Sequence, residues 1–189
     1  MYKSESDKTV VLDKPCTKFY FEKYKIVDVA HVNNRGKLFI SCVPGLQDIN
    51  SDLAEIKSKV DVVVCLLQWS ELLSLNLLNY PKKAQEKGLL FYHLQIKDLS
   101  APSQEELKAL IPLLVNSLSQ GSNVLVHCKA GLGRAGAICA CCLIHFGLSA
   151  EKSINIVRNQ RPGAIQSKKQ EDCIINYANN FNKYYKTTK

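Results

Sequence analysis

One segment, VLVHCKAGLGRAGAICACCLI at residues 124–144, constrains the fold more than any other part of the chain. An apolar run ends at His127, Cys128 follows at once, three glycines occupy the next eight positions, and a second apolar run comes after them. This order predicts a buried strand, a glycine-rich loop and a helix that begins near Arg134. Such a loop turns backbone N–H groups inward, and the helix N-terminus adds partial positive charge, so the segment predicts an anion cradle.

Short apolar runs alternate with helical patterns along the rest of the chain. Five runs have the length and composition of buried strands: Lys25–Val29, Leu38–Val43, Asp61–Leu67, Leu89–Gln95 and Asn123–His127. Strands separated by helices predict an α/β fold, with a single domain, a mostly parallel central sheet of about five strands and helices on both faces. In such a sheet the active site lies at the carboxyl ends of the strands. We expect a polar arm over residues 1–22, a folded domain over residues 23–184 and a basic tail over residues 185–189.

The clearest helical periodicity runs from Leu107 to Leu118, behind a capping box formed by Ser103 and Glu106. Pro112 falls inside this pattern and is expected to bend or break the helix. The other expected helices run from about Arg134 to Phe146, from about Ser149 to a stop before Pro162, and onward from Ser167, whose capping-box partner is Gln170.

Charge and composition narrow the class of protein. The 25 Lys and Arg against 17 Asp and Glu give a formal charge of +8, which favours anionic partners. The basic residues are scattered and no zinc-finger or RNP motif accompanies them, so we expect no nucleic-acid partner. No apolar run is long enough for a membrane span, and the first residues lack the apolar core of a signal peptide. We therefore expect eight reduced cysteines and a cytoplasmic protein, with the nucleus as a second location.

Cys128 is the candidate nucleophile. Thiols at helix N-termini beside basic groups are ionised at neutral pH, and the thiolate is the reactive form. Arg134 stands six positions later and can hold two oxygens of a phosphoryl group with its planar guanidinium. The segment thus predicts a nucleophile and an anion-binding side chain that act on one ligand.

HCKAGLGRAG at residues 127–136 resembles the signature loop of the cysteine-dependent protein phosphatases, in which His-Cys is followed by five residues, Arg and usually Ser or Thr. ISCVPG at residues 40–45 is similar to the kinase-associated phosphatases, the loop is similar to the mitotic-exit phosphatases, and Ala135 resembles the phosphatases of regenerating liver. The similarity runs from about Lys25 to Tyr184. It implies that residues 23–184 form a phosphatase catalytic domain of the dual-specificity type.

The resemblance implies a role for each residue of this loop. Cys128 attacks phosphorus and forms a phosphocysteine, while Arg134 binds the phosphoryl oxygens. His127 is expected to hold the loop and the thiolate by hydrogen bonding, and a histidine that is merely buried is the alternative. The remaining substrate-binding groups are the backbone N–H groups of Lys129, Ala130, Gly131, Leu132 and Gly133.

The departing oxygen of a phosphate ester needs a proton, and the resemblance implies a general acid on a separate loop. Asp98 in IKDLSAPS follows the fourth expected strand and is the candidate. Its alternative role is to close a turn before the helix at Ser103. Asp48 and Asp52, in another loop, are weaker candidates.

RPGAIQSKKQ at residues 161–170 resembles a glutamine-bearing segment that borders the pocket and positions water for the second chemical step. Gln166 is the better candidate for that role, because Gln170 has an alternative role in the capping box of Ser167. Glu71 in QWSEL resembles an acidic residue at the pocket rim of relatives. A solvated charge on a helix is the alternative interpretation of Glu71.

Two groups of cysteines remain. Cys65 ends the third expected strand, and the resemblance to tensin-like and regenerating-liver phosphatases implies a reversible Cys65–Cys128 disulfide, with an inert thiol as the alternative. Cys141 stands four residues before His145 on a helix, but lone cysteines on an apolar helix are usually core residues. We therefore expect no metal and no other cofactor.

The resemblance implies a monomeric enzyme with a shallow pocket that hydrolyses phosphotyrosine, phosphoserine and phosphothreonine in phosphoproteins. A first alternative is a phosphoinositide phosphatase, with anionic lipid as partner, because Lys129 matches the HCKAG of the tensin-like lipid phosphatases. Leu132 stands where those enzymes have a second lysine. A second alternative is a regulatory protein that binds phosphoproteins and turns over slowly, because Ala135 replaces the usual Ser or Thr.

Overall fold

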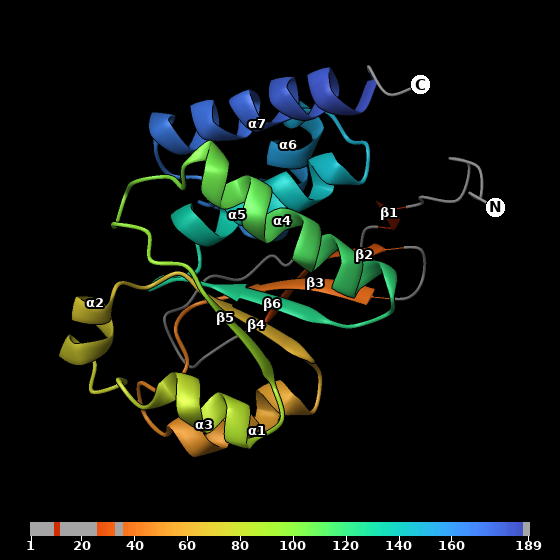
Figure 1. Ribbon diagram of the computed structural model, residues 1–189. Coiled ribbons are helices and arrows are strands. Elements are labelled where there is room, and N and C mark those ends of the chain that lie inside the picture. Colours follow the sequence, from red (N-terminus) through yellow and green to blue (C-terminus); the bar gives the residue numbers. More distant parts are fainter. Residues whose placement is uncertain (1–9, 12–25, 33–35, 187–189) are drawn as a thin grey trace.

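The computed structural model describes residues 10–11, 26–32 and 36–186. Within them six strands form one sheet in the order β1-β2-β3-β6-β4-β5 (Figure 1). The strands are β1 (Val10–Val11), β2 (Val27–Val32), β3 (Gly36–Ser41), β4 (Val62–Cys65), β5 (Leu90–His93) and β6 (Val124–His127). The four strands β3, β6, β4 and β5 run parallel, while β1 and β2 pair antiparallel at one edge. The expected α/β fold is confirmed.

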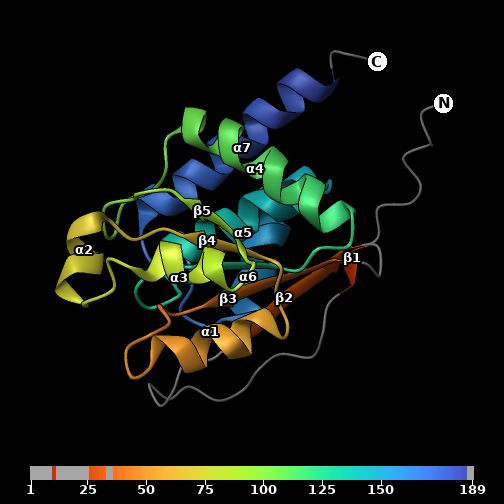
Figure 2. The same ribbon diagram turned by 60° about the horizontal axis from the view of Figure 1, so that its bottom comes forward.

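Helices cover both faces of the sheet (Figures 1 and 2). They are α1 (Ile49–Lys57), α2 (Trp69–Ser74), α3 (Tyr80–Glu86), α4 (Gln104–Ser119), α5 (Gly133–His145), α6 (Ala150–Gln160) and α7 (Lys168–Lys186). Helices α1 and α3 pack on one face, and α4 to α7 pack on the other. Side chains of β4 alternate between the two cores, because successive residues of a strand point to opposite faces. This burial on both faces explains the continuous apolar runs in the sequence.

Helix α4 is unbroken from Gln104 to Ser119 with Pro112 inside it. The expectation that this proline could break the helix is therefore wrong. A proline inside a helix costs about 3 kcal/mol, whereas burying each Leu or Ile side chain contributes about 1.5–3 kcal/mol. Leu107, Ile111 and Leu114 are all fully buried on α4, so their packing outweighs the cost.

The ends of the chain are described only in part. Most of the expected arm over residues 1–22, with Lys25 and residues 187–189, lies outside the described residues. The described piece of the arm, Val10–Val11, forms β1, which pairs with β2. The sequence patterns did not predict β1. At the other end α7 continues through Lys186. No helix in the described ranges is both long and apolar enough to cross a membrane.

The carboxyl ends of three parallel strands meet in the middle of the sheet. Ser41 of β3 and Cys65 of β4 are both register partners of His127 in β6. The segments that leave these strands therefore start side by side, and one of them begins with Cys128.

Candidate active site

The loop between β6 and α5 is held from outside through its carbonyl groups. Val43 N donates to Lys129 O at 3.1 Å, and Ile165 N donates to Leu132 O at 3.3 Å. Arg161 donates from Nη2 to Ala130 O at 3.1 Å and from Nε to Gly131 O at 3.2 Å. The backbone N–H groups of residues 129–134 donate to no acceptor within the described part of the chain. Because the carbonyls are turned outward and bound, these N–H groups form the cradle that an anion would fill.

Gly131 is required by this geometry. Its φ is +66°, in the left-handed region that favours glycine. A Cβ atom built on Gly131 would lie 2.1 Å from Ser41 O and 2.5 Å from Cys42 N. The loop can pass this close to the end of β3 only because a glycine stands here.

Helix α5 begins at the loop without a side-chain cap. Its N-cap is Leu132, an apolar residue that makes no capping hydrogen bond. The N–H groups of the first turn therefore stay available to a ligand. Cys128 is 2% exposed and lies at the entrance to this loop, directly after β6.

Arg134 is fixed by a two-point ion pair with Glu71. Its Nη1 lies 2.6 Å from Glu71 Oε2 and its Nη2 lies 2.9 Å from Glu71 Oε1, while Nη1 also donates to Ile96 O at 2.9 Å. The Arg134 side chain is 1% exposed, and its Nε has no hydrogen-bond partner within the described residues. A buried, unpaired N–H of this kind is satisfied when an oxyanion binds beside it.

Glu71 thus has a defined position, and it is not a solvated charge on α2. Burial raises the pKa of Glu71, but the hydrogen bonds from Arg134 and from Gln68 N, with the positive charges of Arg134 and Lys129, outweigh burial and lower the pKa. Glu71 is therefore ionised at neutral pH and orients the guanidinium.

Asp98 lies at the same guanidinium and shares Nη2 with Glu71. Its Oδ1 is 3.1 Å from Arg134 Nη2, and its side chain is 64% exposed. The segment that carries Asp98 is tied to the start of α7, because Ser167 Oγ donates to Leu99 O and Gln170 Nε2 donates to Ser100 O, both at 3.0 Å. The structure therefore brings Asp98 and Arg134 together.

The weaker acid candidates have structural partners. Asp48 is the N-cap of α1 and accepts from Asn50 N at 2.9 Å. Asp52 accepts from Gly45 N at 2.7 Å and holds the loop before α1. Neither contact involves the cradle, so Asp98 is the candidate acid that the geometry favours.

Gln170 and Gln166 both lie against the first residue of α5. A Cβ atom built on Gly133 would lie 2.7 Å from Gln170 Nε2 and 3.1 Å from Gln166 Oε1. Gln170 is fully buried, and its Oε1 accepts from Gln166 N at 2.8 Å and from Ser167 N at 3.2 Å. Gln170 thus completes the expected capping box and supports the Asp98 segment, whereas Gln166 is exposed at the loop.

His127 is buried beneath the loop. Its Nε2 lies 3.0 Å from Tyr80 Oη, and its backbone carbonyl accepts from Leu66 N at 3.0 Å. Burial lowers the pKa of His127 to about 3, and the neighbouring charges of His93 and Arg134 act in the same direction. His127 is therefore neutral near pH 7 and cannot act as a general acid there.

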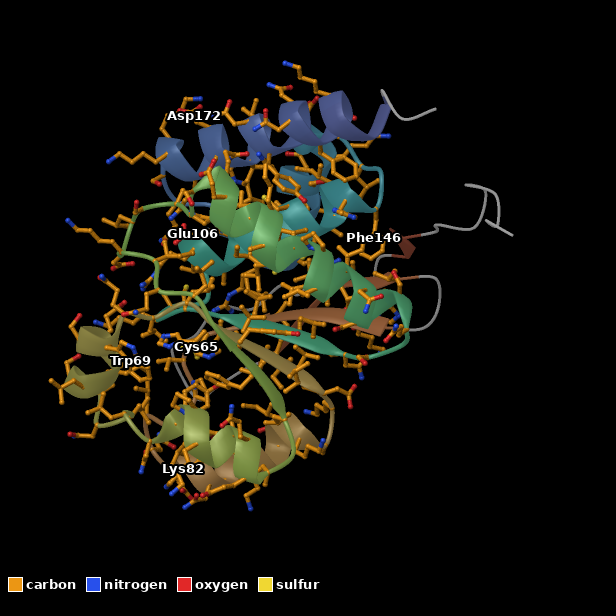
Figure 3. The ribbon with its side chains drawn as sticks, in the orientation of Figure 1. Cys65, Trp69, Lys82, Glu106, Phe146 and Asp172 are labelled. Carbon is orange, nitrogen blue, oxygen red and sulfur yellow. The ribbon has the colours of Figure 1, made fainter. Side chains whose placement is uncertain are left out.

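Cys65 lies beside His127 at the end of β4, and Figure 3 shows it inward of Trp69 on α2. Its side chain packs in the core that α1 and α3 cover, whereas Cys128 packs in the opposite core. Burial raises the pKa of the Cys65 thiol to about 12. In the structure Cys65 is thus a protonated thiol.

The remaining cysteines on α5 are core residues. Cys139, Cys141 and Cys142 are fully buried, and burial raises the pKa of each thiol. Nowhere in residues 10–11, 26–32 and 36–186 does a group of three or more His, Cys, Asp or Glu side chains come together to hold a metal ion.

The sequence patterns missed two supporting residues. Arg161 ties the loop to the segment before α7, and Tyr80 holds His127. The position of Arg161 at the start of RPGAIQ, a few residues before Gln166, was the available signal for the first. No signal in the sequence linked Tyr80 to the site.

The contacts of Arg161 predict the effect of replacing it. In Arg161→Lys the charge remains, but a single ammonium cannot reproduce the two directed hydrogen bonds to Ala130 O and Gly131 O. Loss of charge-assisted bonds of this kind costs about 1.5–3 kcal/mol, so we expect vanadate to bind at least tenfold more weakly. Titration of vanadate checks this, and Lys87→Met, at the exposed residue directly after α3, is the control. Equal affinity in Arg161→Lys and the original chain would contradict a role in positioning the loop.

Comparison with known proteins identifies the family whose model this chain matches. The family model described as "Polymorphic toxin system, DSP-PTPase phosphatase" matches residues 32–148. The chain is 33% identical over 99 residues to Protein tyrosine phosphatase domain-containing protein 1 of Danio rerio, a match that covers 52% of this chain and 14% of that protein. It is 30% identical over 109 residues to Tyrosine-protein phosphatase CDC14 of Saccharomyces cerevisiae, which covers 57% of this chain and 20% of that protein. The chain thus spans about one seventh of the first relative's length.

A third relative matches over more of its length. Cyclin-dependent kinase inhibitor 3 of Rattus norvegicus is 28% identical over 163 residues, 81% of this chain and 75% of that protein. Among solved structures, kinase associated phosphatase with its catalytic site cysteine replaced by serine superposes with a TM-score of 0.74 at 24% identity, over 87% of this chain and 97% of that one. PTPMT1 in complex with PI(5)P superposes with a TM-score of 0.69 at 18% identity, over 78% and 94%. Both structures show the same fold.

Proposed function

The chain belongs to the DSP-PTPase phosphatase family of polymorphic toxin systems, and so to the superfamily of cysteine-dependent dual-specificity phosphatases. On that premise we propose that it hydrolyses phosphotyrosine, phosphoserine and phosphothreonine monoesters in phosphoproteins through a phosphocysteine intermediate. The observation that carries the proposal is the run of backbone N–H groups over residues 129–134 that have no acceptor among the described residues, with Cys128 at its start and Arg134 at its end.

In the first step Cys128 Sγ attacks phosphorus in line with the ester oxygen. The S–P bond forms as the P–O bond breaks, and the electron pair of that bond stays on the leaving oxygen. The loop N–H groups and Arg134 stabilise the charge on the three equatorial oxygens. Asp98, protonated when the substrate is bound, gives its proton to the leaving oxygen.

In the second step water attacks the phosphocysteine and the S–P bond breaks, which restores the Cys128 thiolate and releases phosphate. Asp98, now ionised, accepts the proton of the attacking water. Gln166 is exposed beside Gly133 and is suited to orient that water. Gln170 supports both partners, since it bonds Gln166 N and Ser100 O.

The proposal is tested by measuring phosphate release from phosphotyrosine, phosphoserine and phosphothreonine peptides and from inositol phospholipids side by side. We expect all three peptides to be hydrolysed. Release from lipids alone would favour the second candidate. Tight peptide binding without release would favour a regulatory protein that turns over slowly.

Phosphoinositide hydrolysis is the second candidate function. It is favoured by the exposed Lys129 in the loop and by the fold shared with PTPMT1, whose structure was solved with PI(5)P bound. Against this candidate, the loop lacks the second lysine of the tensin-like lipid phosphatases, because Leu132 occupies that position. We therefore rank phosphoproteins first. The proposal includes a monomer in the cytoplasm or nucleus, which light scattering and cell fractionation can check.

Ala135 predicts a slow second step. A hydroxyl at this position would donate to the departing Cys128 sulfur, and a hydrogen bond to a charged group is worth about 1.5–3 kcal/mol. Each 1.36 kcal/mol changes a rate tenfold, so dephosphorylation should be roughly 10–100-fold slower than with serine. We expect a burst of leaving group in rapid mixing and faster steady-state turnover in Ala135→Ser.

The matched control for that experiment is Ala137→Ser, which adds the same hydroxyl to a buried position on α5. It should leave the turnover number unchanged. If the original chain shows no burst and Ala135→Ser is no faster, the loop N–H groups alone stabilise the thiolate and Ala135 costs little.

Mild oxidation is predicted to link Cys65 to Cys128. Hydrogen peroxide converts the Cys128 thiolate to a sulfenic acid, and the Cys65 thiol then displaces water to form the disulfide. Because the two residues pack in opposite cores and burial raises the pKa of Cys65 to about 12, we expect slow formation that speeds up above neutral pH. Peptide mapping after peroxide checks the linkage. Cys128 found joined to another cysteine, or only as sulfinic acid, would count against it.

A further inference from the structure

Three exposed lysines stand next in sequence to residues of the candidate site. Lys97 directly precedes Asp98, Lys129 directly follows Cys128, and Lys169 lies in the first turn of α7 directly before Gln170. We call these three the basic rim. Each belongs to a different segment, and all three segments contribute residues to the site described above.

No ion pair among residues 10–11, 26–32 and 36–186 neutralises the charge of the basic rim. In the described part of the chain none of the three lysines has a carboxylate within 4.0 Å. The nearby acids have other partners. Glu71 and Asp98 pair with Arg134, and Glu171 and Asp172 pair with Arg158 and Lys168.

Hydrogen bonds fix where two of these lysines lie relative to each other. Ser167 Oγ donates to Leu99 O, and Gln170 Nε2 donates to Ser100 O, so the segment after Lys97 is fastened to the segment that contains Lys169 (Figure 1). Lys129 lies on the β3 side of the loop, because its carbonyl accepts from Val43 N, whereas Lys97 follows β5, and β6 and β4 lie between β3 and β5 in the sheet. Positive charge therefore flanks the cradle on more than one side.

We propose that the basic rim binds acidic side chains on both sides of the phosphorylated residue of a phosphoprotein substrate. The inference rests on the proposed phosphoprotein phosphatase function and adds the class of sequence that the site selects. An extended chain that crosses the loop carries its carboxylates away from the phosphate in two directions, which suits lysines on separate segments. An inositol headgroup holds its phosphates on one ring and suits them less well.

The test uses the full chain with Cys128→Ser, so that binding is measured without turnover. Fluorescence anisotropy would compare phosphopeptides that differ only in flanking residues, with Asp and Glu against Ser and Ala. We expect the acidic peptides to bind about tenfold more tightly, with a preference that fades as salt screens the exposed charges. Lys97→Glu/Lys169→Glu should remove this preference and favour peptides with basic flanks.

The matched control is Lys87→Glu/Lys152→Glu, which reverses two exposed lysines, one directly after α3 and one on α6, and leaves the net charge equal to that of the test variant. Equal affinity for acidic and neutral peptides, or the same loss in both variants, would overturn the inference. So would a rim variant that loses binding to phosphoinositide vesicles but not to peptides. Because the readout is binding, a failure of the original chain to release phosphate would count against the proposed function and not against the basic rim.

Discussion

Phosphate release from phosphopeptides is expected to fall by roughly 10⁴–10⁶-fold in Cys128→Ser, while the peptides still bind. The hydroxyl keeps the position of the thiol at the entrance to the loop, and the N–H groups of residues 129–134 do not change. A serine hydroxyl is a far weaker nucleophile than a thiolate when no base activates it. The neighbouring His127 is too weak a base to take this role, because burial lowers its pKa to about 3.

Phosphate release over hours and peptide binding by calorimetry together check this result. Cys42→Ser is the matched control, because Cys42 contacts the same loop at Gly131 but lies outside the cradle. It should turn over at close to the original rate. A Cys128→Ser chain that retains a tenth or more of the original activity would show that another group is the nucleophile.

Asp98→Asn is expected to slow hydrolysis of esters with poor leaving groups by roughly 10²–10⁴-fold, and to leave esters with good leaving groups almost unaffected. The amide cannot donate a proton to the departing oxygen, but a leaving group of low basicity does not need one. The structure adds a second expectation. Removing the carboxylate 3.1 Å from Arg134 Nη2 removes a competitor for the guanidinium, so inorganic phosphate should bind as tightly or more tightly.

A series of aryl phosphates with leaving groups of increasing basicity checks this prediction. The effect is measured as a change in the slope of the logarithm of the rate against leaving-group basicity. Asp48→Asn is the control, because asparagine preserves the N-cap of α1. Equal slowing across the series, or no slowing at all, would assign the proton to a different group.

The sequence predicted features that depend on residues close together in the chain. The strand, loop and helix around Cys128 follow from local apolar patterns and glycines, and so does the capping box of Gln170. Local patterns could not predict contacts between distant segments, and only the family resemblance placed Asp98 and Glu71 near the loop. Glu71 is 63 residues from Arg134, and Tyr80 is 47 residues from His127. Their pairing depends on how α2 and α3 pack beside the sheet, which local patterns do not encode.

Local patterns also could not predict that α4 continues through Pro112, because this too depends on tertiary packing. Proline lowers helix propensity wherever it occurs, and the sequence alone does not show how much burial opposes it. In the tertiary structure α4 packs against α5 and buries one apolar stripe, and this burial stabilises the helix despite the proline.

The outward-facing carbonyls of the phosphate loop have a consequence for the thermodynamics of binding. Two separate segments of the chain, one at Val43 and one over residues 161–165, hold the loop in one conformation before any ligand arrives. The conformational entropy lost in ordering the loop is therefore part of the cost of folding and is not subtracted from the affinity. Oxyanion binding should accordingly be driven by enthalpy, with little ordering of the backbone, and it should raise the melting temperature of the whole domain.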